Sequence, residues 1–171
     1  MGIYNAAPNK KDKYHQGTYQ IKNSEKFIGN EEKCFYRSSY ELKFMVYCDS
    51  SENVVKWGSE QIAIPYQDWD PIAKTYKDRR YFIDFIVEDI KGDKWLIEVK
   101  PLSETLEIFN ETAPAPPKNE TSKSLENYEY KLRQWSTNRH KWSQAIEYAQ
   151  ARGYKFKIIT EESLNKSNVT V

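Results

Sequence analysis

The chain has 171 residues, which suits one domain with an ordinary hydrophobic core. Its 26 basic and 25 acidic residues give a net charge of +1, so overall charge does not indicate a nucleic-acid-binding protein, and only local clusters of basic residues can. The absence of any apolar run of about 18 residues, and of an apolar signal-peptide core near the N-terminus, excludes a membrane span and predicts a cytoplasmic protein.

The first 33 residues are polar, rich in Lys and Asn, and only weakly periodic. We interpret residues 1–33 as an N-terminal arm that is either loosely ordered or packed over the domain that follows. The domain is expected to span residues 34–165, and residues 166–171 are expected to form a C-terminal tail.

The first regular element is predicted just after the arm. Ser38 is followed three residues later by Glu41, which is a capping-box pattern at a helix start. Apolar residues then recur at helical spacing, at Leu42, Met45 and Val46. The pattern predicts a helix from about residue 39 to residue 49. Cys34 and Cys48 form no CxxC or disulfide pattern, so both are expected to be reduced and to serve in packing.

Two strand-forming segments follow the helix. VVKWGSEQIAIPY, residues 54–66, predicts a strand that is broken near Gly58 and that either ends at Pro65 or lies at a sheet edge there. RRYFIDFIVEDIKGDKWLIEVKP, residues 79–101, consists of two apolar runs on either side of a turn at Gly92. This second segment predicts a β-hairpin.

The hairpin brings two acidic residues together. Pairing it about Lys91 places Asp84 opposite Glu98 on one face, with Lys100 one step further along, whereas a shift of one residue would separate the faces. Directly opposed like charges are destabilising, and a divalent cation offsets them. Mg²⁺ is typically held by one or two carboxylates together with waters and phosphate oxygens. We therefore predict Asp84 and Glu98 as metal ligands.

Lys100 gains a role in the same arrangement. Its ammonium group is placed to orient a metal-bound water or to stabilise charge on a phosphate, which predicts hydrolysis of a phosphodiester. The pattern is short, however, and a Glu and a Lys two residues apart on a strand are more often a solvated face with a surface ion pair. Both interpretations remain open for Glu98 and Lys100 at this point.

The rest of the chain predicts a loop, a long helix and a strand. Residues 111–124 are rich in Pro, Ser and Thr and are expected to form a mobile loop. The helix that follows carries an apolar stripe, at Leu132, Trp135, Trp142, Ala145, Ile146 and Ala149. Gly153 stands where a C′ glycine would end it, and YKFKIIT, residues 154–160, predicts a final strand. This order of elements indicates an α/β (α+β) fold.

FIDF, residues 82–85, together with IEVK, residues 97–100, resembles the core of the PD-(D/E)xK nucleases, with Ile83 in place of the usual Pro. WGSEQIAIPY before this core and NRHKWSQAIEYAQARGYKFKIITEESL after it extend the likeness to about residues 10–165. Together these motifs resemble the TnsA-like endonucleases and, more closely, the head-completion nucleases of T-even-type tailed phages.

The resemblance implies a restriction-endonuclease-like core, with a central mixed β-sheet flanked by helices. It also implies cleavage of double-stranded DNA with Mg²⁺, for which Mn²⁺ can substitute, by Asp84 and Glu98 as metal ligands and Lys100 as the catalytic lysine. The acidic residue that the family carries on the preceding helix falls on Glu41, which the capping box explains equally well. The implied setting is the phage portal and neck, where packaged DNA ends are processed before tail joining, in the host cytoplasm or the virion.

Several residues near this core are candidates for DNA contacts. Arg80 flanks the strand of Asp84 and is placed to approach the DNA backbone. Asn138 and Lys141 lie three residues apart on one helix face and are candidates for phosphate contacts, although a solvated helix face explains them equally well. For Glu60, a structural hydrogen-bonding role and a role at the site are equally supported.

Two other functions fit the same residues. The first is a structural neck protein or DNA-end-binding protein that keeps the fold but relies little on cleavage. The second is a transposon or restriction endonuclease of the TnsA-like kind. In every case the near-neutral net charge of +1 predicts weak, salt-sensitive DNA binding by the isolated protein, with a partner delivering the substrate.

Overall fold

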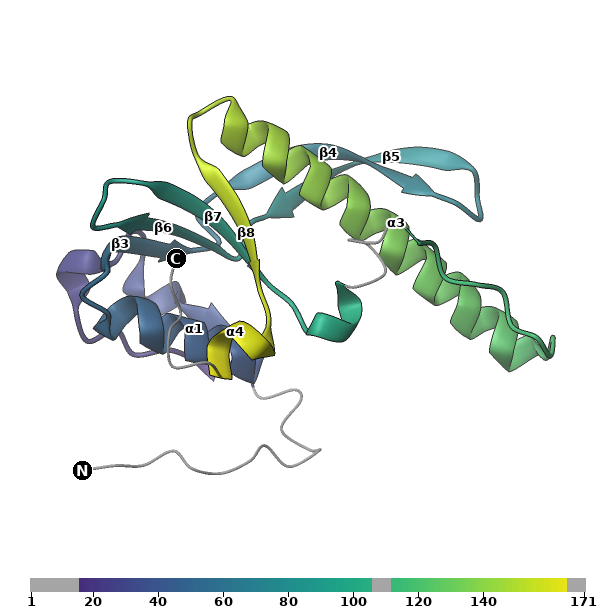
Figure 1. The fold of residues 1–171 in the computed structure, drawn as a ribbon, viewed down its shortest axis with the longest axis horizontal. Helices are drawn as coiled ribbons and strands as arrows, with labels where there is room; N and C mark the ends of the chain where they lie inside the picture. The colour runs from purple at the N-terminus through teal and green to yellow at the C-terminus, as the bar shows by residue number, and fades with distance from the viewer. Residues whose placement is uncertain (1–15, 106–111, 166–171) are drawn as a thin grey trace.

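The computed structural model describes residues 16–105 and 112–165. Its elements are β1 (Gly17–Thr18), η2 (Ser24–Lys26), η3 (Glu31–Lys33), β2 (Phe35–Tyr36), α1 (Ser39–Ser50), β3 (Val54–Ser59), β4 (Ala63–Asp70), β5 (Thr75–Phe82), β6 (Phe85–Asp89), β7 (Lys94–Val99), η4 (Leu102–Glu104), α3 (Ser122–Gln150), β8 (Lys155–Ile159) and α4 (Glu161–Asn165) (Figure 1). The predicted tail and most of the predicted arm, residues 1–15, lie outside the described residues. Within the described ranges, no helix is both long and apolar enough to cross a membrane.

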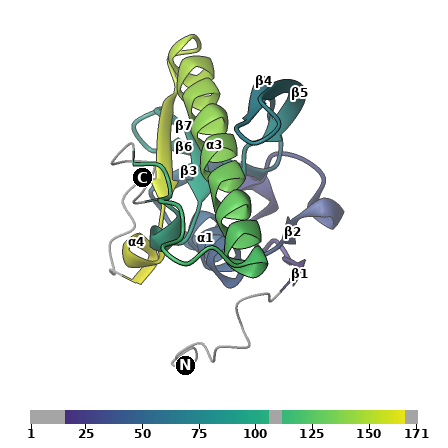
Figure 2. The same cartoon turned by 90° about the vertical axis from the view of Figure 1, so that its right-hand side faces the viewer.

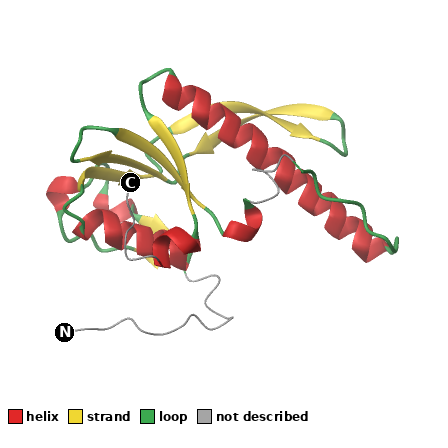
Figure 3. Ribbon diagram, in the orientation of Figure 1, coloured by secondary structure: helices red, strands yellow, loops and turns green. Residues whose placement is uncertain are grey.

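The central sheet has four strands in the order β3-β6-β7-β8. β6 runs antiparallel to β3 and β7, whereas β8 runs parallel to β7. A parallel pair needs a crossover connection, which α3 supplies. α1 and α4 cover one face of the sheet and α3 covers the other (Figures 1 and 3). The predicted mixed sheet flanked by helices is therefore confirmed.

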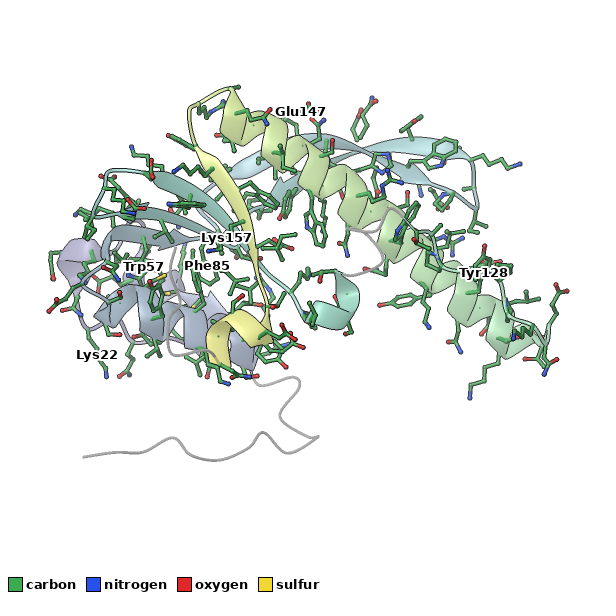
Figure 4. The ribbon with its side chains drawn as sticks, in the orientation of Figure 1. Lys22, Trp57, Phe85, Tyr128, Glu147 and Lys157 are labelled. Carbon is green, nitrogen blue, oxygen red and sulfur yellow. The ribbon has the colours of Figure 1, made fainter. Side chains whose placement is uncertain are left out.

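Each face of the sheet carries its own hydrophobic core. Toward α1 the core includes Trp57 and Phe85, whose ring centroids lie 6.4 Å apart (Figure 4). Toward α3 the core includes Leu96 and Trp142. Because successive residues of a strand point to opposite faces, Glu98 lies on the same face of β7 as Leu96 and is directed toward the α3 side.

α1 begins as the capping pattern predicts. The Ser38 Oγ atom accepts a hydrogen bond from the backbone N–H of Glu41 at 3.1 Å. The buried residues of the helix are Phe44, Met45, Cys48 and Asp49. The predicted apolar stripe is therefore wrong at Val46, which is 47% exposed. The face of α1 that packs on the sheet runs through Met45 and Cys48, and Val46 lies outside it.

The described part of the N-terminal segment packs against the domain through a buried carboxylate. Asp49, near the end of α1, accepts a hydrogen bond from the Tyr19 hydroxyl at 2.8 Å. It also accepts hydrogen bonds from the backbone N–H groups of Lys22 and Asn23, at 2.9 and 3.0 Å. The segment is thus tied to α1 by one side chain that satisfies three donors.

The strand around Gly58 is broken close to where the sequence predicts, since β3 ends at Ser59 and β4 begins at Ala63. The strand does not end at Pro65, which lies inside β4, but β4 is an edge strand, as the other predicted alternative requires. β4 and β5 form a separate two-stranded ribbon, and Pro is tolerated there because each strand of such a ribbon has an unpaired edge. Figure 2 shows α3 in front of the sheet, with the β4–β5 ribbon to one side and β8 to the other.

The hairpin of β6 and β7 has the predicted register, in which Phe85 pairs with Ile97. Its turn is held by Asp89, whose Oδ1 atom accepts hydrogen bonds from the backbone N–H groups of Lys91 and Asp93 at 2.9 and 3.0 Å. The carboxylate therefore fixes the turn, and the turn fixes the pairing of the two strands.

Upstream of β6 the chain differs from the predicted hairpin arm. β5 ends at Phe82 and pairs with β4, and β6 begins only at Phe85. Between them, the carbonyl of Asp84 accepts a hydrogen bond from the backbone N–H of Glu60 at 3.0 Å. RRYFIDF is therefore not part of one continuous strand, because the chain changes its pairing partner at Ile83 and Asp84.

α3 is a 29-residue helix that starts inside the predicted loop, at Ser122. Thr121 and Ser124 form a reciprocal cap, in which each backbone N–H donates to the other hydroxyl, at 2.8 and 3.2 Å. The N-terminal half of α3 extends beyond the sheet, and Tyr128 lies on this half (Figures 1 and 4).

The C-terminal half of α3 packs on the sheet and the ribbon. Its buried apolar residues are Trp142, Ala145 and Ala149. The predicted stripe is wrong at Ile146, which is 41% exposed because it lies beside this row and not in it. The helix ends as predicted, since Gly153 has a φ of +69° and the N–H of Tyr154 donates to the carbonyl of Ala149 at 2.8 Å.

Candidate active site

Asp84 lies where the chain leaves the β4–β5 ribbon and enters the central sheet. Its Oδ2 atom accepts a hydrogen bond from the backbone N–H of Val99, on β7, at 2.8 Å. The side chain is therefore turned toward the strand that carries Glu98. Asp84 precedes Phe85, the first residue of β6 that pairs with β7. Asp84 is therefore held beside β7 by the hydrogen bond of its side chain and not by backbone pairing.

Glu98 is buried, with 3% of its surface exposed. The Tyr81 hydroxyl donates a hydrogen bond to its Oε2 atom. Its Oε1 atom lies 3.6 Å from the Nζ atom of Lys100. A side chain this buried is not part of a solvated strand face. We refer to Asp84 and Glu98 together as the carboxylate centre.

Burial and like charge shape the electrostatics of the carboxylate centre. Burial raises the pKa of the Asp84 carboxyl well above its usual range, and the charge of Glu98 raises it further. Burial lowers the pKa of the Lys100 ammonium, but the charges of Glu98 and Asp84 outweigh this effect, so the net pKa is raised. Burial and the charge of Glu98 also raise the pKa of Tyr81. Lys100 and Tyr81 therefore both stay protonated at neutral pH.

Glu41 is fixed by the cap of α1. Its Oε2 atom accepts a hydrogen bond from the backbone N–H of Arg37 at 2.9 Å, and its Oε1 atom accepts one from the Ser38 hydroxyl at 3.2 Å. Its negative charge contributes to the raised pKa of Asp84. Glu41 thus lies near the carboxylate centre with both oxygens engaged, and direct metal contact by Glu41 stays a prediction.

The donor set fits a hard divalent ion held by two carboxylates. Among residues 16–105 and 112–165, no three His, Cys, Asp or Glu side chains come close enough together to hold a metal. Asp84, just before β6, and Glu98, on β7, nevertheless both present carboxylate oxygens on the same side of the sheet, and their mutual repulsion favours a cation between them. Mg²⁺ commonly takes one or two carboxylates and completes its octahedron with waters and phosphate oxygens.

The three residues predicted to bind DNA occupy different surroundings. Lys141 lies beside the site, with its Nζ atom 5.3 Å from the centre of the Tyr81 ring. Asn138, one turn earlier on α3, is only 7% exposed and so does not belong to a solvated helix face. Arg80 is exposed, and because it precedes Tyr81 on β5 it points to the opposite face of the ribbon. DNA contacts by all three stay predictions.

Sequence reasoning misses Tyr81 and Arg37. In a continuous hairpin arm Tyr81 and Asp84 would point to opposite faces, and only the change of pairing partner after Phe82 brings the Tyr81 hydroxyl to Glu98. Arg37 pairs with Glu60 across 23 residues of sequence, with Nη2 and Oε2 3.2 Å apart, and no local pattern signals such a contact.

A mixed sheet with an Asp at a strand break, and with Glu-x-Lys on the neighbouring strand, defines a PD-(D/E)xK-type nuclease core. A family model described as TnsA-like endonuclease, N-terminal, matches residues 51–161, a range that contains Asp84, Glu98 and Lys100 but not Glu41. The chain belongs to this family of endonucleases. It is also 34% identical over 150 residues to the head completion nuclease of Enterobacteria phage T4. This alignment covers 88% of the present chain and 93% of the T4 protein.

Proposed function

We propose that this protein is a DNA endonuclease that depends on a divalent metal, Mg²⁺ or its substitute Mn²⁺, and hydrolyses phosphodiester bonds in double-stranded DNA. The observation that carries the proposal is that Asp84, at the break before β6, hydrogen-bonds to β7 beside Glu98, with the Lys100 Nζ atom 3.6 Å from the Glu98 Oε1 atom. Burying two carboxylates together costs several kcal/mol without compensation, so the arrangement is better explained by a bound cation than by stability. Membership of an endonuclease family supports it.

The residues of the site have separate roles in this proposal. Asp84 and Glu98 would hold the ion, with Glu41 as a candidate third ligand. A divalent ion supplies a water of lowered pKa and offsets charge on the phosphate. Lys100, which stays protonated, orients the attacking water. The water oxygen would bond to phosphorus and give up a proton to solvent as the bond from phosphorus to the leaving oxygen breaks; the leaving oxygen would take up a proton from solvent, and no covalent enzyme intermediate would form.

The T4 relative suggests the biological setting. That protein is named a head completion nuclease, and by this likeness we propose that the present chain trims packaged phage DNA ends before tail joining. It would act in the cytoplasm of the infected host and then remain in the virion at the neck. Phage portal or neck proteins would be its partners, and they would deliver the DNA that a protein of net charge +1 binds weakly alone.

Cleavage of linear and supercoiled DNA, with Mg²⁺, Mn²⁺ or EDTA, tests the proposed activity. Asp84→Ala and Lys100→Ala should abolish metal-dependent cutting. Lys91→Ala, at the exposed hairpin turn, is the matched control and should cut like the wild type.

The outcomes separate this proposal from its rivals. Cutting that persists in Asp84→Ala would place the chemistry elsewhere or reveal a contaminant. A wild type that binds DNA but cuts none, with either metal, would favour a structural neck or DNA-end-binding protein. Cutting confined to one defined sequence end would favour an enzyme of transposition or restriction.

A further inference from the structure

Arg37 and Glu60 form a charged pair beside the carboxylate centre, to which the proposed mechanism gives no role. Both terminal nitrogens of the Arg37 guanidinium donate to the Glu60 carboxylate, with Nη2 and Oε2 3.2 Å apart. Arg37 lies between β2 and α1, and Glu60 lies in the connection from β3 to β4. Their side chains are 55% and 36% exposed, so solvent and large ligands can reach the pair.

The backbone of each residue is tied directly to the active site. The N–H of Arg37 donates to Glu41 at 2.9 Å, and the N–H of Glu60 donates to the carbonyl of Asp84 at 3.0 Å. The hydrogen bond to Glu60 raises the pKa of Arg37, and the charges of Glu41 and Asp84 also contribute. The guanidinium is therefore at the surface yet within electrostatic reach of Asp84.

The pair adds little to the stability of the fold. Glu60 has a φ of +52°, in the left-handed region, where a residue other than glycine costs roughly 1 kcal/mol or more. An exposed ion pair contributes about 0–1 kcal/mol. The cost and the gain nearly cancel, so stability does not explain why the chain holds Arg37 in this place. Strained non-glycine residues cluster at functional sites.

We propose that Arg37 is a substrate-binding residue that binds a DNA phosphate next to the scissile bond, and that Glu60 orients the Arg37 guanidinium in the DNA-free protein. The planar guanidinium fork fits phosphate oxygens as well as carboxylate oxygens. Replacing an exposed carboxylate partner by a phosphate therefore loses little and retains the geometry. The inference rests on the proposed function, because it needs DNA at the carboxylate centre.

Arg37 is one of three cationic side chains in the neighbourhood of the carboxylate centre. Lys100 follows β7, Lys141 extends from α3, and Arg37 precedes α1, so the three positive groups come from three different elements. Arg37 is the most exposed of the three, which suits a contact to the DNA backbone beside the reacting phosphate.

Three variants test the role of Arg37. Arg37→Ala removes the guanidinium but keeps the backbone N–H that Glu41 accepts, so the helix cap is retained. Glu60→Gln removes the competing negative charge. Arg152→Ala removes an exposed arginine at the far end of α3 and serves as the matched control. Binding of a fluorescent DNA duplex is measured against salt concentration in EDTA, and kcat and KM are measured separately in Mg²⁺.

Arg37→Ala should weaken duplex binding about tenfold and reduce the slope of log K against log salt by about 1. It should raise KM more than it lowers kcat. Glu60→Gln should tighten binding, because a phosphate no longer competes with a carboxylate for the guanidinium. Arg152→Ala should leave binding and cleavage unchanged, and all three variants should melt within a few degrees of the wild type.

An unchanged salt slope in Arg37→Ala would overturn the proposal. So would a Glu60→Gln variant that loses as much DNA affinity as Arg37→Ala, because the ion pair would then maintain the local structure and Arg37 would not itself contact the phosphate. A wild type that binds no duplex even at low salt would overturn it too. If the wild type binds but does not cut, the nuclease function fails, while the role of Arg37 is still decided by the salt slope.

Discussion

Tyr81 and Glu98, 17 residues apart in the chain, meet through a hydrogen bond from the Tyr81 hydroxyl to the Glu98 Oε2 atom. Tyr81 belongs to the β4–β5 ribbon and Glu98 to the central sheet. The contact therefore fixes the carboxylate from outside its own sheet. It leaves the Oε1 atom on the side of Lys100.

Replacing Tyr81 by Phe should weaken metal binding without removing a metal ligand. Groups that hydrogen-bond to metal ligands typically account for 10–100-fold in metal affinity, so Tyr81→Phe should shift the Mg²⁺ requirement for cleavage upward by about tenfold. The measurement is a Mg²⁺ titration of the cleavage rate. Tyr66→Phe, which removes the hydroxyl of another buried ribbon tyrosine, is the control. Equal shifts in both variants would contradict a specific role for Tyr81.

Replacing Asp84 by Asn should abolish cleavage but stabilise the metal-free protein. The amide keeps an oxygen that can accept the Val99 N–H and removes a buried charge facing Glu98. We expect a gain in the free energy of unfolding of roughly 1 kcal/mol at neutral pH. Thermal or urea unfolding in EDTA checks it. A variant less stable than the wild type would indicate that the charge of Asp84 supports the fold.

The gain from Asp84→Asn should also depend on pH. The folded-state pKa of Asp84 is raised above the unfolded value of about 3.9, so the folded state binds the extra proton more tightly. Wild-type stability from this group is therefore retained below the unfolded pKa and is lost as pH rises toward the folded pKa. The stability difference between variant and wild type should be small near pH 4 and larger at pH 8.

Removing the Asp49 carboxylate should strongly destabilise the fold. Asp49→Ala leaves the Tyr19 hydroxyl and two backbone N–H groups without their acceptor, and Asp49 is only 1% exposed. We expect a loss of roughly 2–4 kcal/mol in the free energy of unfolding. Asp93→Ala, which breaks an exposed pair with Lys155, should cost less than about 1 kcal/mol. Similar losses in the two variants would show that Asp49 does not anchor the N-terminal segment.

Both cysteines should resist thiol reagents while the protein is folded. Cys34 and Cys48 are 1% and 0% exposed. Burial raises the pKa of the Cys34 thiol to about 12 and also raises that of Cys48. Neither forms the reactive thiolate near pH 8, so a colorimetric thiol reagent should count no thiols in the native protein and two in denaturant. Fast labelling of the native protein would indicate local opening around α1.

The same two thiols should make the free energy of unfolding fall as the pH becomes alkaline. Their folded pKa values lie above the unfolded value of about 8.5, so ionisation favours the unfolded state. Stability should therefore fall as pH rises above about 8.5, and replacement of both cysteines by Ser should reduce that slope. Urea unfolding at a series of alkaline pH values measures it.

The sequence predicts the hairpin and its register because both depend on local features. The turn around Gly92 and the alternation of apolar residues are enough to place Phe85 against Ile97. The start of α1 at Ser38 and its cap are local for the same reason. That register brings Asp84, just before the first ladder pair, close to the strand that carries Glu98.

The rest of the site depends on contacts that no local pattern specifies. Periodicity does not show that β5 pairs with β4 and leaves the hairpin after Phe82, and this change is what brings Tyr81 to Glu98. The ion pair of Arg37 and Glu60 joins two connections that are distant in sequence. Val46 and Ile146 are apolar and lie beside the buried rows, so spacing alone assigns them to the wrong faces.

The number of residues in the turn held by Asp89 determines how Asp84 and Glu98 are placed relative to each other. Asp84 directly precedes one arm of the hairpin and Glu98 lies on the other, and the stretch from Ile90 back to Asp84 is roughly 20 Å long at the usual rise of a strand. One residue inserted at the turn would direct Glu98 to the opposite face, whereas two would restore the face but move it along the strand. The position of Glu98 relative to Asp84 is thus set by the number of residues in the turn at the other end of the hairpin.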